Sequence, residues 1–328
     1  MVEAETKPIP KVAFVFPGQG SQAVGMGLEL YRASREAREV FEEADDALQL
    51  PLSRLCFEGP EDELRETINA QPAILTVSIA CLRAARNLHD EVRPAFVAGH
   101  SLGEYTALVS ANVLEFSDAV RIVRERGRLM HEAGMKKPGG MAAIIGLDES
   151  ALEEVCLETG AQIANMNCSG QIVISGSRET LARSMDLAKT RGARRVIPLQ
   201  VSGAFHSTLM EPAVEGMSRA LSGVIFSEPA VPIIANSTAK PLTTAGEVKG
   251  ELVAQICSCV RWQPSVEYMV EDGVNTFLEI GPGQVLSGLI KRISSEVQVL
   301  NLSDMESIEA AKLQGSVVRI VRATDGSS

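Results

Sequence analysis

A short apolar strand that runs straight into a Gly-x-Ser-x-Gly turn is the feature that most narrows the fold of this chain. Val97 and Ala98 end the apolar run, and Gly99-His100-Ser101-Leu102-Gly103 follows. Glycines on both sides of the serine allow a sharp, closely packed turn that lifts the hydroxyl off the sheet. Residues 102–109 favour a helix, whose N-terminus would stabilise an oxyanion beside Ser101. The stretch therefore predicts a parallel α/β sheet with Ser101 as a candidate nucleophile. The same five-residue pattern also arises by chance in Gly-rich chains, and the flanking strand and helix favour catalysis.

Length and composition narrow the possible functions. A chain of 328 residues exceeds the usual size of one domain, which predicts two domains or one domain with an insertion. A net charge of −11, with three tyrosines and one tryptophan, argues against binding to nucleic acid. No uninterrupted apolar run reaches the roughly 20 residues of a membrane span, and residues 1–11 lack the features of a secretory signal or transit peptide. We therefore expect a soluble protein without a membrane partner, its transit peptide either absent or removed.

The six cysteines are scattered through mostly apolar segments, which is typical of reduced thiols. Cys257 and Cys259 are the one close pair. They have no second pair and no histidine near them in the sequence, so helix packing is favoured over a zinc site. The sequence predicts no bound metal.

The N-terminal strand is followed by a glycine-rich loop with two possible uses. Val12–Phe16 is a continuous apolar run, typical of a strand buried on both faces of a parallel sheet. Gly18 to Ala23 then fits the G-x-G-x-x-A fingerprint of dinucleotide sites. That fingerprint requires a second strand ending in an acid about 20 residues further on, whereas Ser34–Leu48 has charges at helical spacing. The alternative is an exposed turn that presents backbone N–H groups and Gln19 to a reacting carbonyl.

A buried arginine is predicted on the helix from Ser117 to Gly134. Ser117 would cap its start, and Gly134 would end it. At 100° per residue, the apolar stripe around Arg126 contains Ala119, Ile122, Val123, Leu129 and Met130. A buried guanidinium needs an anionic partner. That partner is either an acid of the same chain or the carboxylate of a ligand, which a guanidinium grips through two parallel hydrogen bonds.

A change of pattern marks a second unit. Between a linker at Lys136 to Gly140 and Leu199, strands and helices alternate as β-α-β-β-α-β, the split ferredoxin-like arrangement. We therefore predict a ferredoxin-like subdomain over 137–202, inserted into an α/β-hydrolase-like subdomain made of 1–136 and 203–328. His206 follows the insertion on a Gly/Ser-rich turn, which makes it the candidate general base, with a core or solvated histidine as the alternative. His89 and His131 have charged surroundings, and His100, beside the serine, would support the turn.

Six blocks of sequence, taken in order, resemble the malonyl-CoA:acyl carrier protein transacylases of fatty-acid synthesis. They are FPGQGSQ (16–22), GHSLGEYTAL (99–108), RGRLM (126–130), GAFHS (203–207), VRW with SVEYM (260–269) and EIGPG (279–283). The resemblance extends from about Lys11 to Leu302. It implies Ser101 as the nucleophile and His206 as its base, oriented by the main-chain carbonyl of Gln255. It also implies the N–H groups of Gln19 and Leu102 as the oxyanion hole, Arg126 as the clamp for the malonyl carboxylate, and Met130 and His100 as further substrate contacts.

The resemblance implies a ping-pong transfer of malonyl from malonyl-CoA to the phosphopantetheine thiol of acyl carrier protein, without a cofactor. It further implies a monomer in a bacterial cytoplasm or a plastid stroma. Because the carrier protein is acidic in the family, docking would need local basic patches. The candidates are Lys136-Lys137, Arg191, Arg194 and Arg195, and Lys291-Arg292, for each of which a solvated surface is the alternative. Two other functions remain open at this point: a serine thioesterase or carboxylesterase using the same turn, and a regulator that binds a nucleotide or acyl-CoA at the Gly18 loop.

Overall fold

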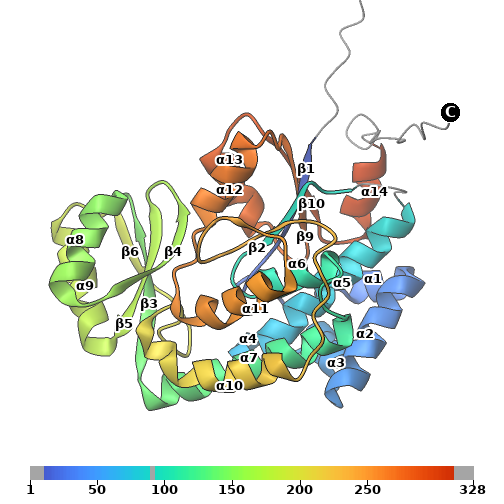
Figure 1. The fold of residues 1–328 in the computed structure, drawn as a ribbon, viewed down its shortest axis with the longest axis horizontal. Coiled ribbons are helices and arrows are strands. Elements are labelled where there is room, and N and C mark those ends of the chain that lie inside the picture. The colour runs from blue at the N-terminus through green and yellow to red at the C-terminus, as the bar shows by residue number, and fades with distance from the viewer. Residues whose placement is uncertain (1–10, 89–92, 314–328) are drawn as a thin grey trace, which may run out of the picture.

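The computed structural model describes residues 11–88 and 93–313, and two β-sheets organise them (Figure 1). The larger sheet has the strand order β10-β9-β1-β2-β7-β8. Its strands are β1 (Val12–Phe16), β2 (Phe96–Gly99), β7 (Ile233–Ile234), β8 (Pro241–Leu242), β9 (Thr276–Ile280) and β10 (Gln298–Leu302). The pairs from β10 to β7 are parallel, whereas β8 lies antiparallel to β7, so the sheet is mixed rather than purely parallel. The short antiparallel strand at the Pro241 edge is a part that the apolar pattern did not predict.

Strand β1 lies at the centre of the large sheet and separates two cores. Phe14 and Phe16 pack into one apolar cluster, and Ala13 and Val15 pack into another. All five residues of the strand are buried. This confirms the prediction that a continuous apolar run is covered on both faces of a sheet, since successive side chains of a strand point in opposite directions.

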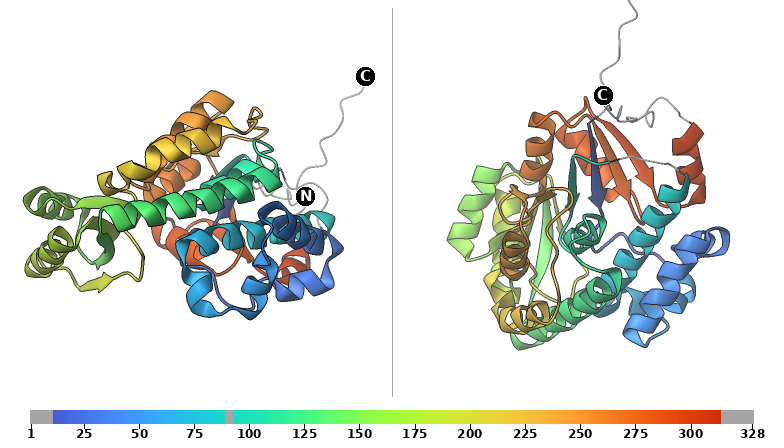
Figure 2. Two further views of the ribbon diagram at one scale, coloured as in Figure 1. Left: turned by 90° about the horizontal axis from the view of Figure 1, so that it is seen from below. Right: turned by 45° about the vertical axis from the view of Figure 1, so that its right-hand side comes forward.

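Helices cover both faces of the large sheet (Figures 1 and 2). In chain order these helices are α1 (Leu28–Ala33), α2 (Arg35–Leu48), α3 (Leu52–Glu58), α4 (Glu61–Arg65), α5 (Thr67–Leu88), α6 (Gly103–Ser110), α7 (Phe116–Lys136), the short 3₁₀ turn η1 (Thr208–Met210), α10 (Glu211–Ser222), α11 (Ala245–Ala254), the 3₁₀ turn η2 (Gln255–Cys257), α12 (Trp262–Glu271), α13 (Val285–Ile293) and α14 (Met305–Leu313). The first core joins α2, α5 and α7, and the second joins α12 and α13.

The smaller unit has four strands and two helices and lies beside the large sheet in Figure 1. Its elements are β3 (Gly139–Ile145), α8 (Glu149–Thr159), β4 (Gln162–Cys168), β5 (Gln171–Ser177), α9 (Arg178–Thr190) and β6 (Arg195–Pro198). The strand order is β4-β5-β3-β6, and the pairs are antiparallel. A separate apolar cluster, which includes Ile144, Leu152 and Ile174, fills the space under its helices. The predicted order of strands and helices in this segment is therefore present.

Two helix limits differ from the sequence-based expectation. Helix α7 begins at Phe116, with Glu115 as its N-cap, and continues through Gly134 to Lys136. Gly134 is buried within it, and a Cβ there would lie 2.6 Å from the backbone oxygen of Ser202, so this glycine serves a close contact and not a helix end. The C-terminal end of α7 extends to the smaller unit, as the left view of Figure 2 shows.

Helix α5 begins at Thr67 and includes Pro72. Its segment Thr67–Ala85 is long enough for a membrane span and has a mean hydropathy of 1.2. However, 83% of that window is buried inside the protein, so α5 is a core helix packed by α2 and α7.

Candidate functional site

The serine turn connects β2 to α6 and is held in a tight conformation. Ser101 has a φ of 53°, in the left-handed region that non-glycine residues rarely adopt. A Cβ on Gly103 would lie 2.1 Å from the backbone oxygen of Phe16, and one on Gly99 would lie 1.9 Å from the carbonyl carbon of Gly103. Both glycines are therefore required for close backbone packing, which is the steric reason that the sequence suggested.

Asn236, at the end of β7, fixes the serine turn from the neighbouring strand. Its Oδ1 accepts a 2.7 Å hydrogen bond from the N–H of Ser101, and its Nδ2 donates a 2.7 Å bond to the carbonyl of Gly99. The side chain thus satisfies one backbone group on each side of His100. Asn236 is 3% exposed, so these bonds are shielded from water.

Ser101 and His206 are in direct contact. Oγ of Ser101 lies 2.7 Å from Nε2 of His206. On the other side of the ring, Nδ1 lies 3.0 Å from the carbonyl oxygen of Gln255 and 3.1 Å from that of Ser258. Carbonyl oxygens only accept hydrogen bonds, so Nδ1 carries the proton and Nε2 is free to accept one from the hydroxyl. Gln255 starts η2, directly after α11, which directs its carbonyl toward the histidine.

The surroundings of His206 keep its ring neutral. The residue is 4% exposed, and burial together with the nearby Arg126 charge lowers the pKa of His206 from its ordinary value of 6.5 to about 3. A neutral imidazole with an unprotonated Nε2 is the form that can take a proton from Ser101.

Arg126 lies at the same hydroxyl and is 1% exposed. Its Nη2 donates to Oγ of Ser101 at 3.1 Å and to Oε1 of Gln255 at 2.8 Å, and its Nη1 donates to Oε1 of Gln71 at 2.7 Å. The guanidinium also lies over the ring of Tyr105, with its carbon 5.6 Å from the ring centroid. No carboxylate within residues 11–88 and 93–313 forms an ion pair with Arg126, so the acid partner considered from sequence is not a direct contact.

One buried acid reaches Arg126 indirectly, with the side chain of Gln255 between them. Glu104, in the first turn of α6, is fully buried. Its Oε2 accepts a hydrogen bond from Nε2 of Gln255, and its Oε1 accepts one from the N–H of Asn236 at 3.1 Å. Burial raises the pKa of Glu104 well above its ordinary value, with the Glu251 charge acting the same way, while these two bonds and the Arg126 charge oppose the rise.

Gln19 and Leu102 lie beside the serine and line the same cavity. Within the described part of the chain, no turn, loop or cap hydrogen bond uses the backbone N–H of either residue. The side chain of Gln19 is held because its Oε1 accepts a 2.9 Å bond from Thr67, whose own hydroxyl accepts a 2.9 Å bond from Gln71. Both backbone N–H groups therefore remain available to a ligand oxygen.

The Gly18 loop packs against the serine turn. A Cβ on Gly18 would lie 2.5 Å from the carbonyl oxygen of His100, and the next helix, α1, does not begin until Leu28. A dinucleotide site needs a helix N-terminus directly at the glycines, so this geometry does not favour one here.

His100 and Met130 complete the predicted set. Nε2 of His100 lies 2.9 Å from Oδ1 of Asn167. The centroid of the His100 ring lies 5.8 Å from the ring centroid of Trp262. The sulfur of Met130 lies 3.6 Å from Nε2 of Gln71. Both residues line the cavity, although the contacts of His100 are those of a support for the turn.

These residues line a cavity of about 420 Å³ that lies between the two units. Ser101, His206, Arg126, Met130, His100, Gln19 and Leu102 line it, together with residues of the smaller unit such as Asn165 and Leu199. Gln255 lies behind this wall, fully buried. In the described ranges, no group of three or more His, Cys, Asp or Glu side chains could hold a metal ion.

Four residues of the site were missed from sequence: Thr67, Gln71, Glu104 and Asn236. Asn236 follows the apolar run 231–235, and Glu104 lies at the start of the helix after Ser101, so both are polar residues close to the region where sites of open α/β sheets gather. Gln71 and Thr67 carried no such signal. They lie in the first turns of α5, and only the packing of that helix brings them to the site.

The fold and the site together define a class: α/β enzymes in which a serine on a strand-to-helix turn hydrogen-bonds to a histidine. Comparison with known proteins identifies the family within this class. Residues 13–322 match the acyl transferase domain family. The malonyl CoA-acyl carrier protein transacylase of Bacillus subtilis is 48% identical over 306 residues, which is 92% of this chain and 96% of the relative. The chain belongs to the acyl transferase domain family and, within it, to the malonyl CoA-acyl carrier protein transacylases.

Solved structures agree with this assignment. The acyl-carrier-protein S-malonyltransferase of Bartonella henselae is 45% identical, with a TM-score of 0.90 over 93% of this chain and 99% of that one. A second structure is a malonyl-transacylase in complex with a type II polyketide synthase acyl carrier protein. It is 40% identical, with a TM-score of 0.90 over 93% of this chain and 99% of that one.

Proposed function

We propose that this protein transfers the malonyl group of malonyl-CoA to the phosphopantetheine thiol of an acyl carrier protein, for fatty-acid synthesis. The intermediate is a malonyl ester of Ser101. One observation carries the choice of malonyl: a buried guanidinium, without a carboxylate partner in the described structure, lies 3.1 Å from the serine hydroxyl. An acyl group with a free carboxylate would supply the missing anion at that place.

The first half-reaction follows from the hydrogen bonds of Ser101. His206 takes the hydroxyl proton at Nε2 as Oγ attacks the thioester carbonyl, a contribution of about 10²- to 10⁴-fold. The N–H groups of Gln19 and Leu102 would hold the oxyanion, each worth about 2.7 to 4 kcal/mol. When the C–S bond breaks, His206 returns its proton to the departing CoA sulfur. The carrier thiol then attacks the ester and reverses these steps. Every step is assigned to this chain's own groups, so the proposal requires no cofactor.

A serine thioesterase or carboxylesterase is the less favoured function. Its triad would place an acid on Nδ1 of the histidine, whereas here two main-chain carbonyls occupy that position. A regulator that binds nucleotides at the Gly18 loop is disfavoured by the packing of that loop against His100.

We also infer the two subdomains that the sequence predicted. The strand order β4-β5-β3-β6, with one helix after the first and one after the third strand of the unit, supports a ferredoxin-like subdomain at 137–202. The parallel strands and the serine turn support an α/β-hydrolase-like subdomain at 1–136 and 203–328. A monomer remains the prediction for the oligomeric state. A bacterial cytoplasm or a plastid stroma remains the predicted location.

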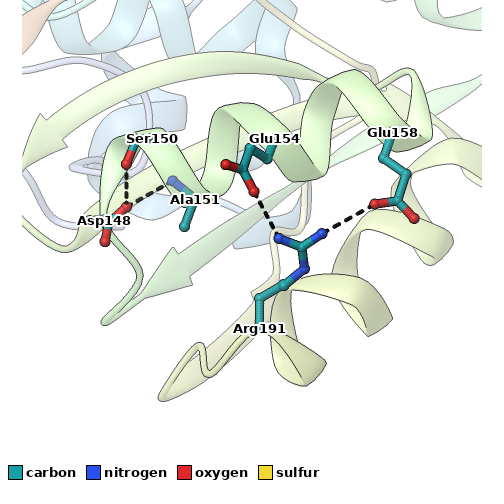
Figure 3. Close-up of polar contacts among 6 residues, drawn as sticks. All are labelled: Asp148, Ser150, Ala151, Glu154, Glu158 and Arg191. Carbon is teal, nitrogen blue, oxygen red and sulfur yellow. Dashed lines mark hydrogen bonds and ion pairs between the residues drawn. The ribbon is translucent and has the colours of Figure 1, made fainter.

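For the carrier protein, we propose a docking surface on exposed basic residues that have no ion pair. Figure 3 shows that Arg191 is not one of them, because its guanidinium nitrogens lie 2.8 Å from Glu154 and 3.4 Å from Glu158. Lys137 is likewise paired with Glu211 at 3.1 Å. Lys136, Arg194, Arg195 and Lys291 are exposed and have no ion pair within the described residues, and Arg292 contacts only the neutral Gln171. Arg194 precedes β6 and Arg195 is its first residue, and the residues that follow β6 line the cavity.

Intact-mass spectrometry tests the proposed function directly. After mixing with malonyl-CoA, the wild-type protein should gain the mass of one malonyl group, and Ser101→Ala should gain none. An ester that persists in Ser101→Ala would identify another nucleophile. Steady release of free malonate without a thiol acceptor would instead favour the hydrolase.

A further inference from the structure

Among the described residues, Glu104 is the buried carboxylate that reaches the Arg126 clamp, and it does so through the Gln255 amide. Resting on the proposed function, we propose that Glu104 is a positioning residue that sets the preference for malonyl by fixing the Gln255 amide and by balancing the Arg126 charge at a distance. The connection contains three residues: Arg126 donates to Oε1 of Gln255 at 2.8 Å, and Nε2 of Gln255 donates to Glu104.

The hydrogen-bond partners of Glu104 favour its carboxylate form. Its two oxygens face two donors, Nε2 of Gln255 and the backbone N–H of Asn236. A protonated carboxyl has an O–H that needs an acceptor of its own, and neither of these two N–H groups can provide one. The carboxylate form satisfies both donors and leaves no O–H unpaired. These contacts therefore favour an anion one amide away from Arg126, against the rise of the Glu104 pKa that burial causes.

The amide of Gln255 can adopt only one orientation between these charges. With Oε1 at Arg126 and Nε2 at Glu104, each end meets its complement, and Nε2 also donates to the carbonyl of Ser101 at 2.9 Å. A flipped amide would set N–H groups against the guanidinium and an oxygen against the carboxylate. Glu104 therefore holds the acceptor that keeps Nη2 of Arg126 directed at the hydroxyl of Ser101.

The intervening amide also explains how the clamp keeps its charge for the substrate. A carboxylate in direct contact with Arg126 would neutralise it and compete with the malonyl carboxylate. A site with no counter-charge would bury an isolated guanidinium, which is costly. A carboxylate one side chain away offsets part of that cost and leaves the guanidinium able to bind a second anion.

The same polar chain continues beyond Arg126. Nη1 donates to Gln71, Gln71 donates to Thr67, and Thr67 donates to Gln19 in the proposed oxyanion loop. In this series of hydrogen bonds, each donor lies on the side nearer to Arg126 and each acceptor on the side nearer to Gln19. The orientation of the guanidinium is therefore shared between the serine turn on one side and the Gln19 loop on the other.

Glu104→Gln is the test, since it keeps the shape and removes the charge. The substituted amide offers one acceptor oxygen where two are needed, so the Gln255 amide loses its fixed orientation. We expect KM for malonyl-CoA to rise about tenfold or more, with acetyl-CoA turnover nearly unchanged. Glu279→Gln is the matched control, because Glu279 is also buried but accepts its bonds from the N–H groups of Leu286 at 3.0 Å and Ser287 at 2.7 Å, outside this chain of contacts. It should leave the ratio of malonyl to acetyl kcat/KM as in the wild type.

A double variant separates positioning from folding. In Glu104→Gln with Gln255→Glu, the bond between the two positions can form with its direction reversed, but the carboxylate now contacts Arg126 directly. We expect a folded protein, by its thermal transition, that forms an acetyl ester but loses its preference for malonyl-CoA. An unchanged malonyl preference in both Glu104→Gln and the double variant would overturn the inference. Wild-type protein that forms no malonyl ester would instead overturn the proposed function, so the two failures are distinct.

Discussion

Arg126 and Ser101 are joined by a hydrogen bond in which Nη2 donates to Oγ at 3.1 Å. The positive charge therefore lies at the atom that would carry the acyl group, and not at a remote part of the cavity. An acyl group attached to Oγ with a carboxylate at its other end can turn back and bind the guanidinium. An acetyl group has no carboxylate and cannot make this contact.

Arg126→Ala should remove malonyl selectivity. Two charged hydrogen bonds to the substrate carboxylate are lost, each worth about 1.5 to 3 kcal/mol, so kcat/KM for malonyl-CoA should fall by two orders of magnitude or more. Acetyl-CoA turnover should persist. Arg124→Ala is the control, because Arg124 lies on the same helix but donates to Asn69 at 3.2 Å. Equal malonyl kinetics in the Arg126 variant and the wild type would contradict the clamp.

The lowered pKa of His206 predicts an unusual pH profile. With a pKa of about 3, the ring stays neutral throughout the range from about pH 5 to 8, so kcat/KM for the free enzyme should show no acid limb near 6.5. Rapid-quench measurement of acylation across this range is the check. A half-loss of rate near pH 6.5 would show that the histidine titrates normally.

The same pKa shift affects stability, with a definite sign. Below about pH 6.5 the unfolded chain protonates this histidine while the folded chain does not, so the stability present above 6.5 is lost as the pH falls toward 3. The free energy of unfolding should fall by as much as about 1.4 kcal/mol per pH unit from this group. His206→Asn, which tolerates the φ of 56°, should have a shallower acid slope in denaturant titrations. Identical slopes would exclude a buried neutral histidine.

Asn236→Ala should damage the serine turn. It leaves the N–H of Ser101 and the carbonyl of Gly99 without their partner, at a cost of about 1 to 3 kcal/mol for each buried group. We expect a lower melting temperature and a slower acylation of Ser101. Asn301→Ala, which removes one 2.8 Å bond to the carbonyl of Gly283, is a control that should leave acylation intact. A full acylation rate in the Asn236 variant would show that the turn holds without it.

Gly103→Ala should prevent the close packing of α6 on β1. The added Cβ would lie 2.1 Å from the oxygen of Phe16, so backbone must move, at a cost of about 1 to 3 kcal/mol or more. Gly250→Ala, in α11, meets no atom within 4 Å and should be neutral or slightly stabilising. Thermal melts of the two variants provide the comparison, and equal melting temperatures would contradict the steric argument.

Reversing Arg194 and Arg195 to Glu should raise KM for the carrier protein about tenfold, through lost electrostatic attraction, and leave malonyl-CoA acylation unchanged. Arg191→Ala is the paired control, since its charge is already balanced by Glu154 and Glu158. Steady-state transfer at varied carrier concentration is the measurement. Carrier kinetics equal to the wild type would eliminate this surface.

The sequence predicted the parts of the fold that depend on local pattern. The apolar run at Val12–Phe16 and the turn at Ser101 were visible because sterics and burial act on neighbouring residues. The limits of α7 were not, because Gly134 looks like a helix end unless one knows that Ser202 passes beside it. The last strand and helix, β10 and α14, were also missed, since an asparagine interrupts the short apolar run of β10 and most of this strand is only half-buried.

The site shows the same division. Ser101, His206 and Arg126 were named from motifs and helical periodicity, and the structure brings them into contact. The residues that hold them, such as Glu104 and Gln71, act only through partners far away in sequence. A chain read in order contains no signal for such pairings, because they follow from the crossing of α5, α6 and α7 with η2.

Gln255 touches the histidine with its main chain and the arginine with its side chain. Substitution can alter only the second of these, since every amino acid brings the same carbonyl. Selection acting at this one position could therefore retune which acyl groups are accepted while the proton-transfer partner stays in place, so substrate range and chemical competence can drift independently in descendants of this fold.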